Sequence, residues 1–111
     1  MDRVVFLYVT APDDAAADAI ASALVQDGFA ACVNILPRIR SVYRWKGVVE
    51  RAEETAMIVK TTAARAVAAR GLIERLHPHE TPAIAAITVS GELSGDKFLA
   101  WINAEISETT S

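Results

Sequence analysis

The residues best suited to hold a metal ion lie in a short segment near position 80. His77, His79 and Glu80 occur where a helical pattern ends and a proline-bounded loop begins. Imidazole nitrogens and carboxylate oxygens are common ligands of Zn²⁺ and Cu²⁺. Their spacing matches no metal motif, so an alternative stays open in which His77 caps the helix carbonyls and His79 is a solvated loop residue.

The single cysteine is a further candidate ligand. Cys32 lies in an extended run and shares a strand face with Asn34, whereas Val33 and Ile35 point to the opposite face. A thiolate suits Cu(I) or zinc, but one thiolate per chain needs donors from elsewhere. The alternative is a small buried apolar residue. Cys32 cannot form an internal disulfide, which fits a reducing compartment.

Another group of residues suits a small anionic ligand. Lys60 and Thr61 directly precede a predicted helix, where an ammonium group and free helix N–H groups attract anions. An ordinary ion pair of Lys60 with Glu54 or Glu53 is the alternative. Tyr43, Trp45 and Glu54 complete the candidate ligand-binding set, although packing at a core or subunit contact also accounts for the two aromatic residues.

Signatures of common enzyme classes are missing from the sequence. It has no glycine-rich phosphate loop, no Gly-x-Ser-x-Gly elbow, no Cys-x-x-Cys pair and no His-Glu-x-x-His helix. A Cys32–His77 pair is the remaining catalytic arrangement, because an imidazole can activate a nearby thiol as a nucleophile. The sequence therefore favours a protein that is not an enzyme and that has no organic cofactor.

Composition argues against two classes of partner. Eleven basic and fourteen acidic side chains give a net charge of −3, so no dominant positive field attracts nucleic acid or an anionic membrane. The apolar run Val4–Val9 is too short for a membrane span and lacks the layout of a signal peptide. We therefore expect a soluble, cytoplasmic protein. A mean hydropathy of +0.26 is high for a small monomer and indicates apolar surface hidden by oligomerisation.

The elements that must position these residues follow from the hydrophobic pattern. Asp13 is a suitable cap for a first helix that ends at Gly28, and Thr62 for a second helix that ends before Pro78. The predicted order is a strand (4–9), a helix (13–28), two long strands (29–45 and 48–61), a helix (62–77), a strand (83–90) and a helix from about 94. The residues predicted to face inward from the last two helices are Ala66, Ala69, Ile73, Leu76, Phe98, Trp101, Ile102 and Ile106.

The two long strands are predicted to form a hairpin. They meet at Lys46-Gly47, where glycine accepts the positive φ of a tight turn. Pro37 cannot donate a hydrogen bond to a neighbouring strand, so it predicts a bulge or bend. Since both strands exceed the usual strand length, the outer half of the hairpin should project beyond the domain.

The outer half of this hairpin has two different faces. With a two-residue turn, Arg40 lies opposite Glu53 and Tyr43 lies opposite Glu50. The basic residues of the first strand and the turn alternate with aromatic and other residues; they are Arg38, Arg40, Arg44 and Lys46. An isolated two-stranded hairpin with exposed Tyr43 and Trp45 is marginal in water, so we expect a partner chain to cover it.

This order of elements predicts one α+β domain over residues 1–111. Strand, helix, strand, strand, helix, strand is the ferredoxin-like, or split β-α-β, sandwich, here with a long hairpin between its second and third strands and an extra C-terminal helix. The polar residues from about 107 to 111 should form a frayed tail.

Several segments together resemble the CutA divalent-cation tolerance family. They are Thr10-Ala11-Pro12-Asp13, Ala31-Cys32-Val33-Asn34-Ile35, Ser41-Val42-Tyr43-Arg44-Trp45-Lys46-Gly47, Glu54, Lys60-Thr61, His77-Pro78, Thr81-Pro82 and Trp101-Ile102. They cover nearly the whole chain in the order and spacing of the family. The resemblance implies a ferredoxin-like homotrimer whose long hairpins pack on neighbouring subunits, with a link to tolerance of divalent metals such as copper.

The chain departs from the family pattern in one place. The family usually has Tyr or Phe after the His-Pro pair and Glu after Thr-Pro, whereas this sequence has His79 and Ala83. A carboxylate is lost at Ala83, and an imidazole is gained at His79.

Three functions follow as hypotheses. The first is a trimeric metal-tolerance or metal-response protein that binds copper or zinc ions near subunit clefts through Cys32, His77, His79 and Glu80. The second is a PII-like sensor or signalling trimer that binds a small anionic metabolite through Lys60 and the hairpin. The third is a scaffold that anchors another protein.

Overall fold

The sheet and its three helices form the predicted ferredoxin-like arrangement with an extra C-terminal helix. The computed structural model describes residues 1–107, and the predicted frayed tail beyond Ser107 lies outside the described residues. Four antiparallel strands follow the spatial order β2-β3-β1-β4. Their bounds are β1 (Val4–Ala11), β2 (Cys32–Trp45), β3 (Val48–Thr62) and β4 (Ile84–Thr88). The helices are α1 (Asp14–Gln26), α2 (Ala63–Leu76) and α3 (Asp96–Ser107).

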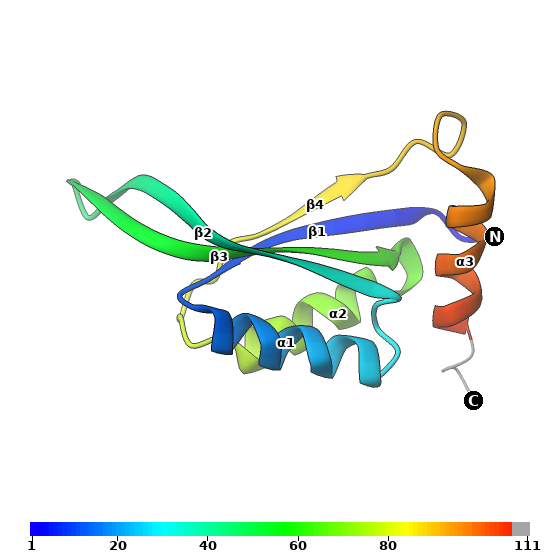
Figure 1. Ribbon diagram of the computed structural model, residues 1–111, viewed down its shortest axis with the longest axis horizontal. Coiled ribbons are helices and arrows are strands. Elements are labelled where there is room, and N and C mark those ends of the chain that lie inside the picture. Colours follow the sequence, from blue (N-terminus) through cyan, green and yellow to red (C-terminus); the bar gives the residue numbers. More distant parts are fainter. Residues whose placement is uncertain (108–111) are drawn as a thin grey trace.

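Two helices cover one face of the sheet. In Figure 1, α1 and α2 lie side by side beneath the strands, and α3 stands at one end. Alternate residues of β1 and β3 point towards α1 and α2, as the two-residue period of a strand requires. The core between these layers includes Leu7, Val9, Met57, Val59, Ile20, Leu24 and Ile73, none more than 3% exposed. A smaller cluster joins α3 to Val4.

The helix caps explain where α1 and α2 begin. The carboxylate of Asp13 accepts the N–H of Ala16 at 2.8 Å, as predicted for an N-cap. Thr62 occupies the N-cap of α2, but its side chain makes no capping hydrogen bond. The carboxylate of Asp2 accepts the N–H of Ala64 instead, at 2.6 Å. This hydrogen bond is the main cause that lowers the pKa of Asp2.

The hairpin follows the prediction closely. Lys46 and Gly47 both have positive φ, 49° and 82°, as a two-residue type I′ turn requires. The register places Arg40 opposite Glu53, and Tyr43 opposite Glu50. It shifts between Leu36 and Ile39, so the bulge predicted from Pro37 is confirmed. Arg38, which lies within this bulge, has a positive φ of 60°.

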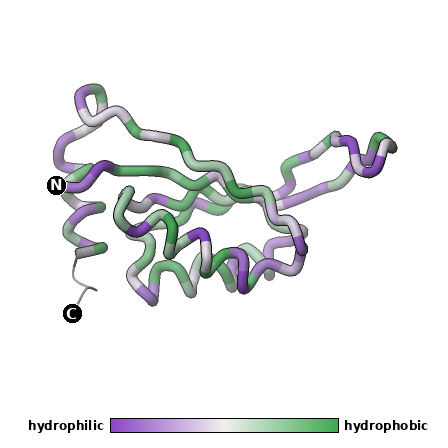
Figure 2. Tube along the Cα trace, turned by 180° about the vertical axis from the view of Figure 1, so that it is seen from behind, coloured by the Kyte–Doolittle hydropathy of each residue, from purple (hydrophilic) through white to green (hydrophobic). Residues whose placement is uncertain are grey.

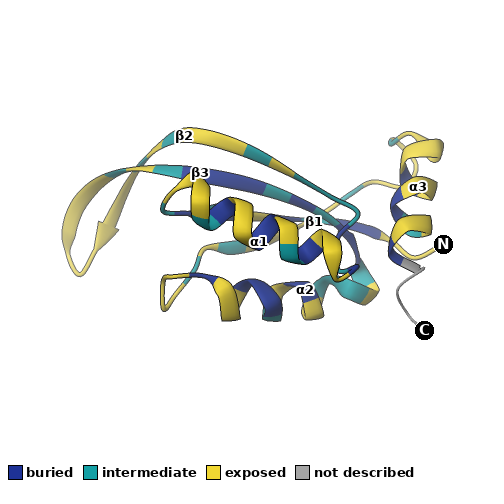
Figure 3. Ribbon diagram, turned by 60° about the horizontal axis from the view of Figure 1, so that its bottom comes forward, coloured by how far each residue is buried: buried dark blue, intermediate teal, exposed yellow. Residues whose placement is uncertain are grey.

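The outer half of the hairpin projects from the rest of the molecule. We call residues 37–54 the arm. Because β1 pairs with β3 only from Thr55 to Thr62, the strands of the arm pair with each other alone. Figure 2 shows hydrophilic and hydrophobic residues along it, and Figure 3 shows that most of the arm is exposed. The molecule measures 45 × 30 × 21 Å, with the arm along its longest dimension.

Three predicted details are wrong. β2 begins at Cys32, because the N–H groups of Phe29 and Ala30 bond to the carbonyl of Leu24 rather than to a strand. Phe98 and Trp101 do not face the core; they are 38% and 43% exposed, and Leu99 is buried instead. In α2 the buried face includes Leu72 rather than Leu76. Within residues 1–107, no helix combines the length and apolar character needed to cross a membrane.

Candidate functional site

His77 is held by hydrogen bonds on both ring nitrogens. It lies at the end of α2 and is only 7% exposed. Its Nδ1 accepts the N–H of His79 at 3.0 Å, which puts the proton of the neutral ring on Nε2. Nε2 then donates to the carbonyl oxygen of Thr10 at 2.7 Å. A metal ion could bind His77 only if one of these hydrogen bonds broke.

The role of His77 is therefore to fasten two parts of the chain together. Its ring joins the end of α2 to β1 through Thr10, and it also orders the turn that leads to His79. The helix carbonyl of Ile73 is bonded by the backbone N–H of His77, at 2.8 Å, and not by its ring. The sequence suggested two roles for the imidazole, metal ligation or capping of the helix. In the structure the ring does neither and instead bonds to Thr10 and His79.

His79 and Glu80 are the accessible donors of this segment. Both are exposed on the loop between α2 and β4. The ring centroids of His77 and His79 lie 5.1 Å apart, with the ring planes tilted by 54°. An imidazole and a carboxylate that are adjacent in the chain and exposed to solvent fit a Zn²⁺ or Cu²⁺ ion that completes its coordination with further ligands.

Cys32 lies far from the histidines. It is partly exposed on the sheet face that α1 and α2 leave open, and it pairs with Lys60, which pairs with Phe6. His77 is bonded to Thr10, four residues further along β1. The backbone position of Cys32 is therefore about 13 Å from that of Thr10 along the strands and about 10 Å from it across them. The structure thus does not bring Cys32 and His77 together, either as metal ligands or as a nucleophile and its base.

The metal donors remain dispersed in the single chain. Within residues 1–107, no three His, Cys, Asp or Glu side chains form a group that could hold a metal ion.

Lys60 and Thr61 are engaged within the protein. The buried hydroxyl of Thr61 donates to the carbonyl of Phe29 at 2.6 Å. Nζ of Lys60 lies 5.7 Å from the ring centroid of Phe6 and 5.3 Å from that of Phe98, within the range of cation–π attraction. The free helix N–H that should attract an anion is instead bonded to Asp2.

The other members of the predicted ligand-binding set lie on the arm. Tyr43 and Trp45 are exposed near its tip, and Nζ of Lys46 lies 5.8 Å from the Trp45 ring centroid. Trp45 is opposite Val48, twelve residues before Lys60 on β3, which corresponds to about 40 Å. Glu54 is six residues from Lys60 on β3, about 20 Å, and Glu53 is one residue further, so the alternative of an ion pair with Lys60 is wrong. One chain does not gather these residues into one site.

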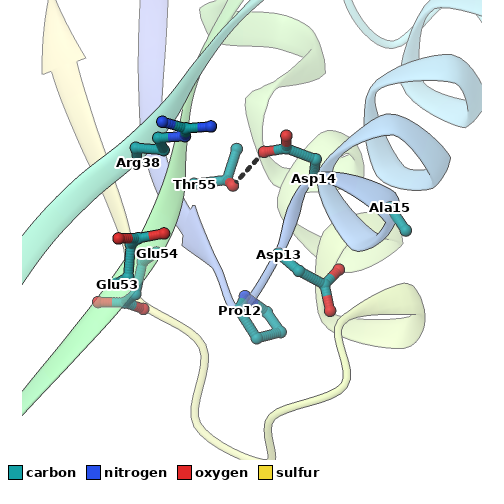
Figure 4. A pocket seen from close by; sticks show the side chains of 8 residues that line it. All are labelled: Pro12, Asp13, Asp14, Ala15, Arg38, Glu53, Glu54 and Thr55. Carbon is teal, nitrogen blue, oxygen red and sulfur yellow. Dashed lines mark hydrogen bonds between the residues drawn. The ribbon is translucent and has the colours of Figure 1, made fainter.

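Sequence reasoning missed a cleft where the arm leaves the domain. It has a volume of about 390 Å³ and is lined by Pro12, Asp13, Asp14, Ala15, Arg38, Glu53, Glu54 and Thr55. The hydroxyl of Thr55 donates to Asp14 at 2.6 Å, whereas the carboxylate of Asp13 points away (Figure 4). Pro37 signalled the bend that forms this cleft, but sequence alone could not place α1 beside it.

Apolar side chains are exposed on two surfaces. One is the open sheet face, which is the side without α1 and α2; its exposed members are Tyr8, Leu36 and Ile87. The other is the arm, where the exposed apolar side chains are Val42, Tyr43, Trp45, Val48 and Val49. Exposed apolar side chains in such numbers are typical of an interface between proteins.

Comparisons with known proteins agree over nearly the whole chain. Residues 5–105 match the family model described as "CutA1 divalent ion tolerance protein". A "Divalent-cation tolerance protein CutA" from Pectobacterium atrosepticum is 40% identical over 95% of this chain and 93% of the relative. A protein of the same description from Archaeoglobus fulgidus is 41% identical over 91% of this chain and 96% of the relative. The crystal structure of CutA from Xylella fastidiosa has a TM-score of 0.89 at 38% identity, covering 94% of this chain and 98% of the other.

Proposed function

Since the chain belongs to the CutA1 divalent ion tolerance protein family, we propose that it serves tolerance of divalent cations as a homotrimer that binds copper or zinc ions near subunit clefts. The observation that carries this proposal is the exposure of apolar side chains on the arm and on the open sheet face. A neighbouring copy that covers the open sheet face and the face of the arm that carries Tyr43, Trp45 and Val48 would complete a fold that one chain leaves open.

The arm supports assembly most strongly. Trp45 is 55% exposed, and the apolar residues around it have no core of their own, because the arm is only two strands thick. Burial of one large side chain contributes about 1.5–3 kcal/mol. The number of three subunits rests on the family resemblance.

Assembly would also bring the dispersed metal donors together. Cys32 lies on the open sheet face, whereas His79 and Glu80 lie on the loop before β4. A single ion can reach both surfaces only if a second chain places its loop near the first chain's sheet. We assign ligation to Cys32, His79 and Glu80, and a positioning role to His77 because both of its ring nitrogens are used.

We further propose that the protein is not an enzyme and that it works in the cytoplasm. The thiol of Cys32 and the imidazole of His77 are too far apart to act as a nucleophile and its base. A reducing compartment would keep the partly exposed Cys32 as the thiol that metal ligation needs.

Native mass spectrometry with and without Cu²⁺ or Zn²⁺ tests this proposal. We expect a trimer that takes up metal in integral ratios, with less uptake in Cys32→Ser and in His79→Ala/Glu80→Gln. Glu74→Gln, at an exposed position of α2, is the matched surface control and should leave uptake unchanged. A monomer would contradict the assembly. A trimer whose uptake is the same in all variants would contradict the assigned ligands.

A further inference from the structure

The register of the arm separates its side chains into two chemically different faces. Directly paired residues of antiparallel strands point to the same side. One face carries the pairs Ile39–Glu54, Ser41–Ala52, Tyr43–Glu50 and Trp45–Val48. The other carries Arg40–Glu53, Val42–Arg51 and Arg44–Val49. We call this second side the arginine face.

The arginine face is exposed and basic. Its three guanidinium groups are opposed by one carboxylate, that of Glu53, which gives a net charge of +2 in a chain whose total is −3. Arg51 lies diagonally across from both Arg40 and Arg44, at a spacing that long side chains can bridge. One nitrogen of Arg44, Nη1, donates to the carbonyl of Gly47 at 3.3 Å.

Arg44 and Arg51 lie opposite valines rather than carboxylates, so cross-strand pairing does not stabilise their charges. Like charges on neighbouring positions of a strand pair repel each other. A bound anion would remove that repulsion and would accept several charge-assisted hydrogen bonds, because a guanidinium group presents its donors in a fork that matches a carboxylate.

Apolar side chains lie between the arginines. Val42 and Val49 are each 58% exposed on the same face. A groove of about 740 Å³ at this part of the arm is lined by Val42, Arg40, Arg51 and Glu53 of the arginine face and by Ile39, Ser41 and Ala52 of the other face. The surface thus offers donors for carboxylates and an apolar strip for aliphatic side chains.

From this complementarity we propose that the arginine face binds an acidic peptide segment of a partner protein, one in which carboxylates alternate with aliphatic side chains. Such a segment matches both the charge and the exposed valines. A nucleic acid matches them less well, because its sugar-phosphate backbone presents little apolar surface for the valines. In addition, the carboxylates of Glu53, Glu54, Asp13 and Asp14 at the base of the arm would repel a longer polyanion. The inference goes beyond the proposed function and does not require a metal ion.

Fluorescence anisotropy with the full chain tests the proposal. The probe is a labelled peptide of alternating Glu and Val, and the comparison ligand is a thymidine oligonucleotide with the same number of charges. We expect Arg40→Gln/Arg51→Gln to raise the Kd of the peptide by about tenfold or more. Arg70→Gln/Arg75→Gln changes the total charge equally on the exposed surface of α2 and should leave the Kd within about twofold.

A variant that binds the peptide more tightly cannot be explained by misfolding, so a second variant is designed to gain affinity. Glu53→Gln removes the only carboxylate of the arginine face and should lower the Kd of the peptide. Equal losses in the two double variants would show unspecific attraction and overturn the proposal. Tighter binding of the oligonucleotide would assign the face to nucleic acid. Loss of assembly in Arg40→Gln/Arg51→Gln, seen by native mass spectrometry, would make a second copy the occupant.

Discussion

The body of the molecule and its arm use their polar and apolar groups in opposite ways. In the body, Thr61, His77 and Thr55 are buried and each side chain is hydrogen-bonded within the chain. On the arm, valines, aromatic rings and guanidinium groups are exposed. A side chain whose contacts are all internal acts on stability, whereas an exposed apolar or charged group is available to another molecule. Stability should therefore depend on the body, and assembly and binding on the arm.

The same substitution at two positions of β3 makes this comparison sharp. Val59 is fully buried in the body, and Val49 is exposed on the arm. We expect Val59→Ala to lower the free energy of unfolding by about 2–3 kcal/mol, because it removes buried methyl groups and leaves a cavity. Val49→Ala should change it by less than about 0.5 kcal/mol. Denaturant unfolding at one protein concentration measures both, and similar losses would show that the arm is part of the core.

Trp45 tests whether assembly depends on the arm. Trp45→Ala should weaken subunit association by about 2 kcal/mol, because it removes a large aromatic anchor from the proposed interface. The secondary structure of the body should not change. Sedimentation across a dilution series measures the association, and Glu74→Ala at an exposed position of α2 is the control. A trimer that resists dilution as well as the unchanged protein does would rule out Trp45 as an anchor.

Local patterns predicted the arm better than they predicted the sites. The turn at Lys46-Gly47, the bulge after Pro37 and the pairing of Arg40 with Glu53 follow from rules that span a few residues, and all are present. The fold followed because each strand and helix carried its own periodicity. Phe98 and Trp101 were wrongly predicted to face the core. Hydrophobic periodicity identifies the apolar face of a helix, but it does not show which part of that face the rest of the fold covers.

The candidate sites depended on contacts that no local pattern contains. Asp2 reaches the first turn of α2 from 62 residues away, and the ring of His77 finds Thr10 across 67 residues. Sequence could identify an imidazole or a free helix end, but it could not show that each already has an internal partner. Both partners became visible only when the sheet placed β1 beside α2.

His77 and His79 are two residues apart and should respond differently. His77→Ala leaves the Thr10 carbonyl and the His79 N–H without their partner, so we expect a loss of about 1–2 kcal/mol in unfolding free energy. His79→Ala, at an exposed position, should lose less than about 0.5 kcal/mol but should reduce metal uptake. Thermal unfolding and native mass spectrometry measure the two effects. If His77→Ala reduced metal uptake and His79→Ala did not, His77 would be the ligand.

Asp2 gives the smallest effect, and its pH dependence separates a specific cap from a general surface charge. Its pKa is lowered mainly by the N–H of Ala64, so its folded-state pKa lies below the usual 3.8. Its contribution is therefore complete above about pH 5 and is lost as the pH falls through the lowered pKa. Since Asp2 is largely exposed, we expect Asp2→Asn to cost only about 0.5 kcal/mol at pH 7. That cost should shrink as the pH falls through the lowered pKa, where the native carboxylate also becomes neutral. Asp18→Asn, at an exposed position within α1, removes the same charge without a cap. Unfolding curves that show equal costs for both variants at pH 7 would mean that net charge, and not the hydrogen bond to α2, underlies the effect.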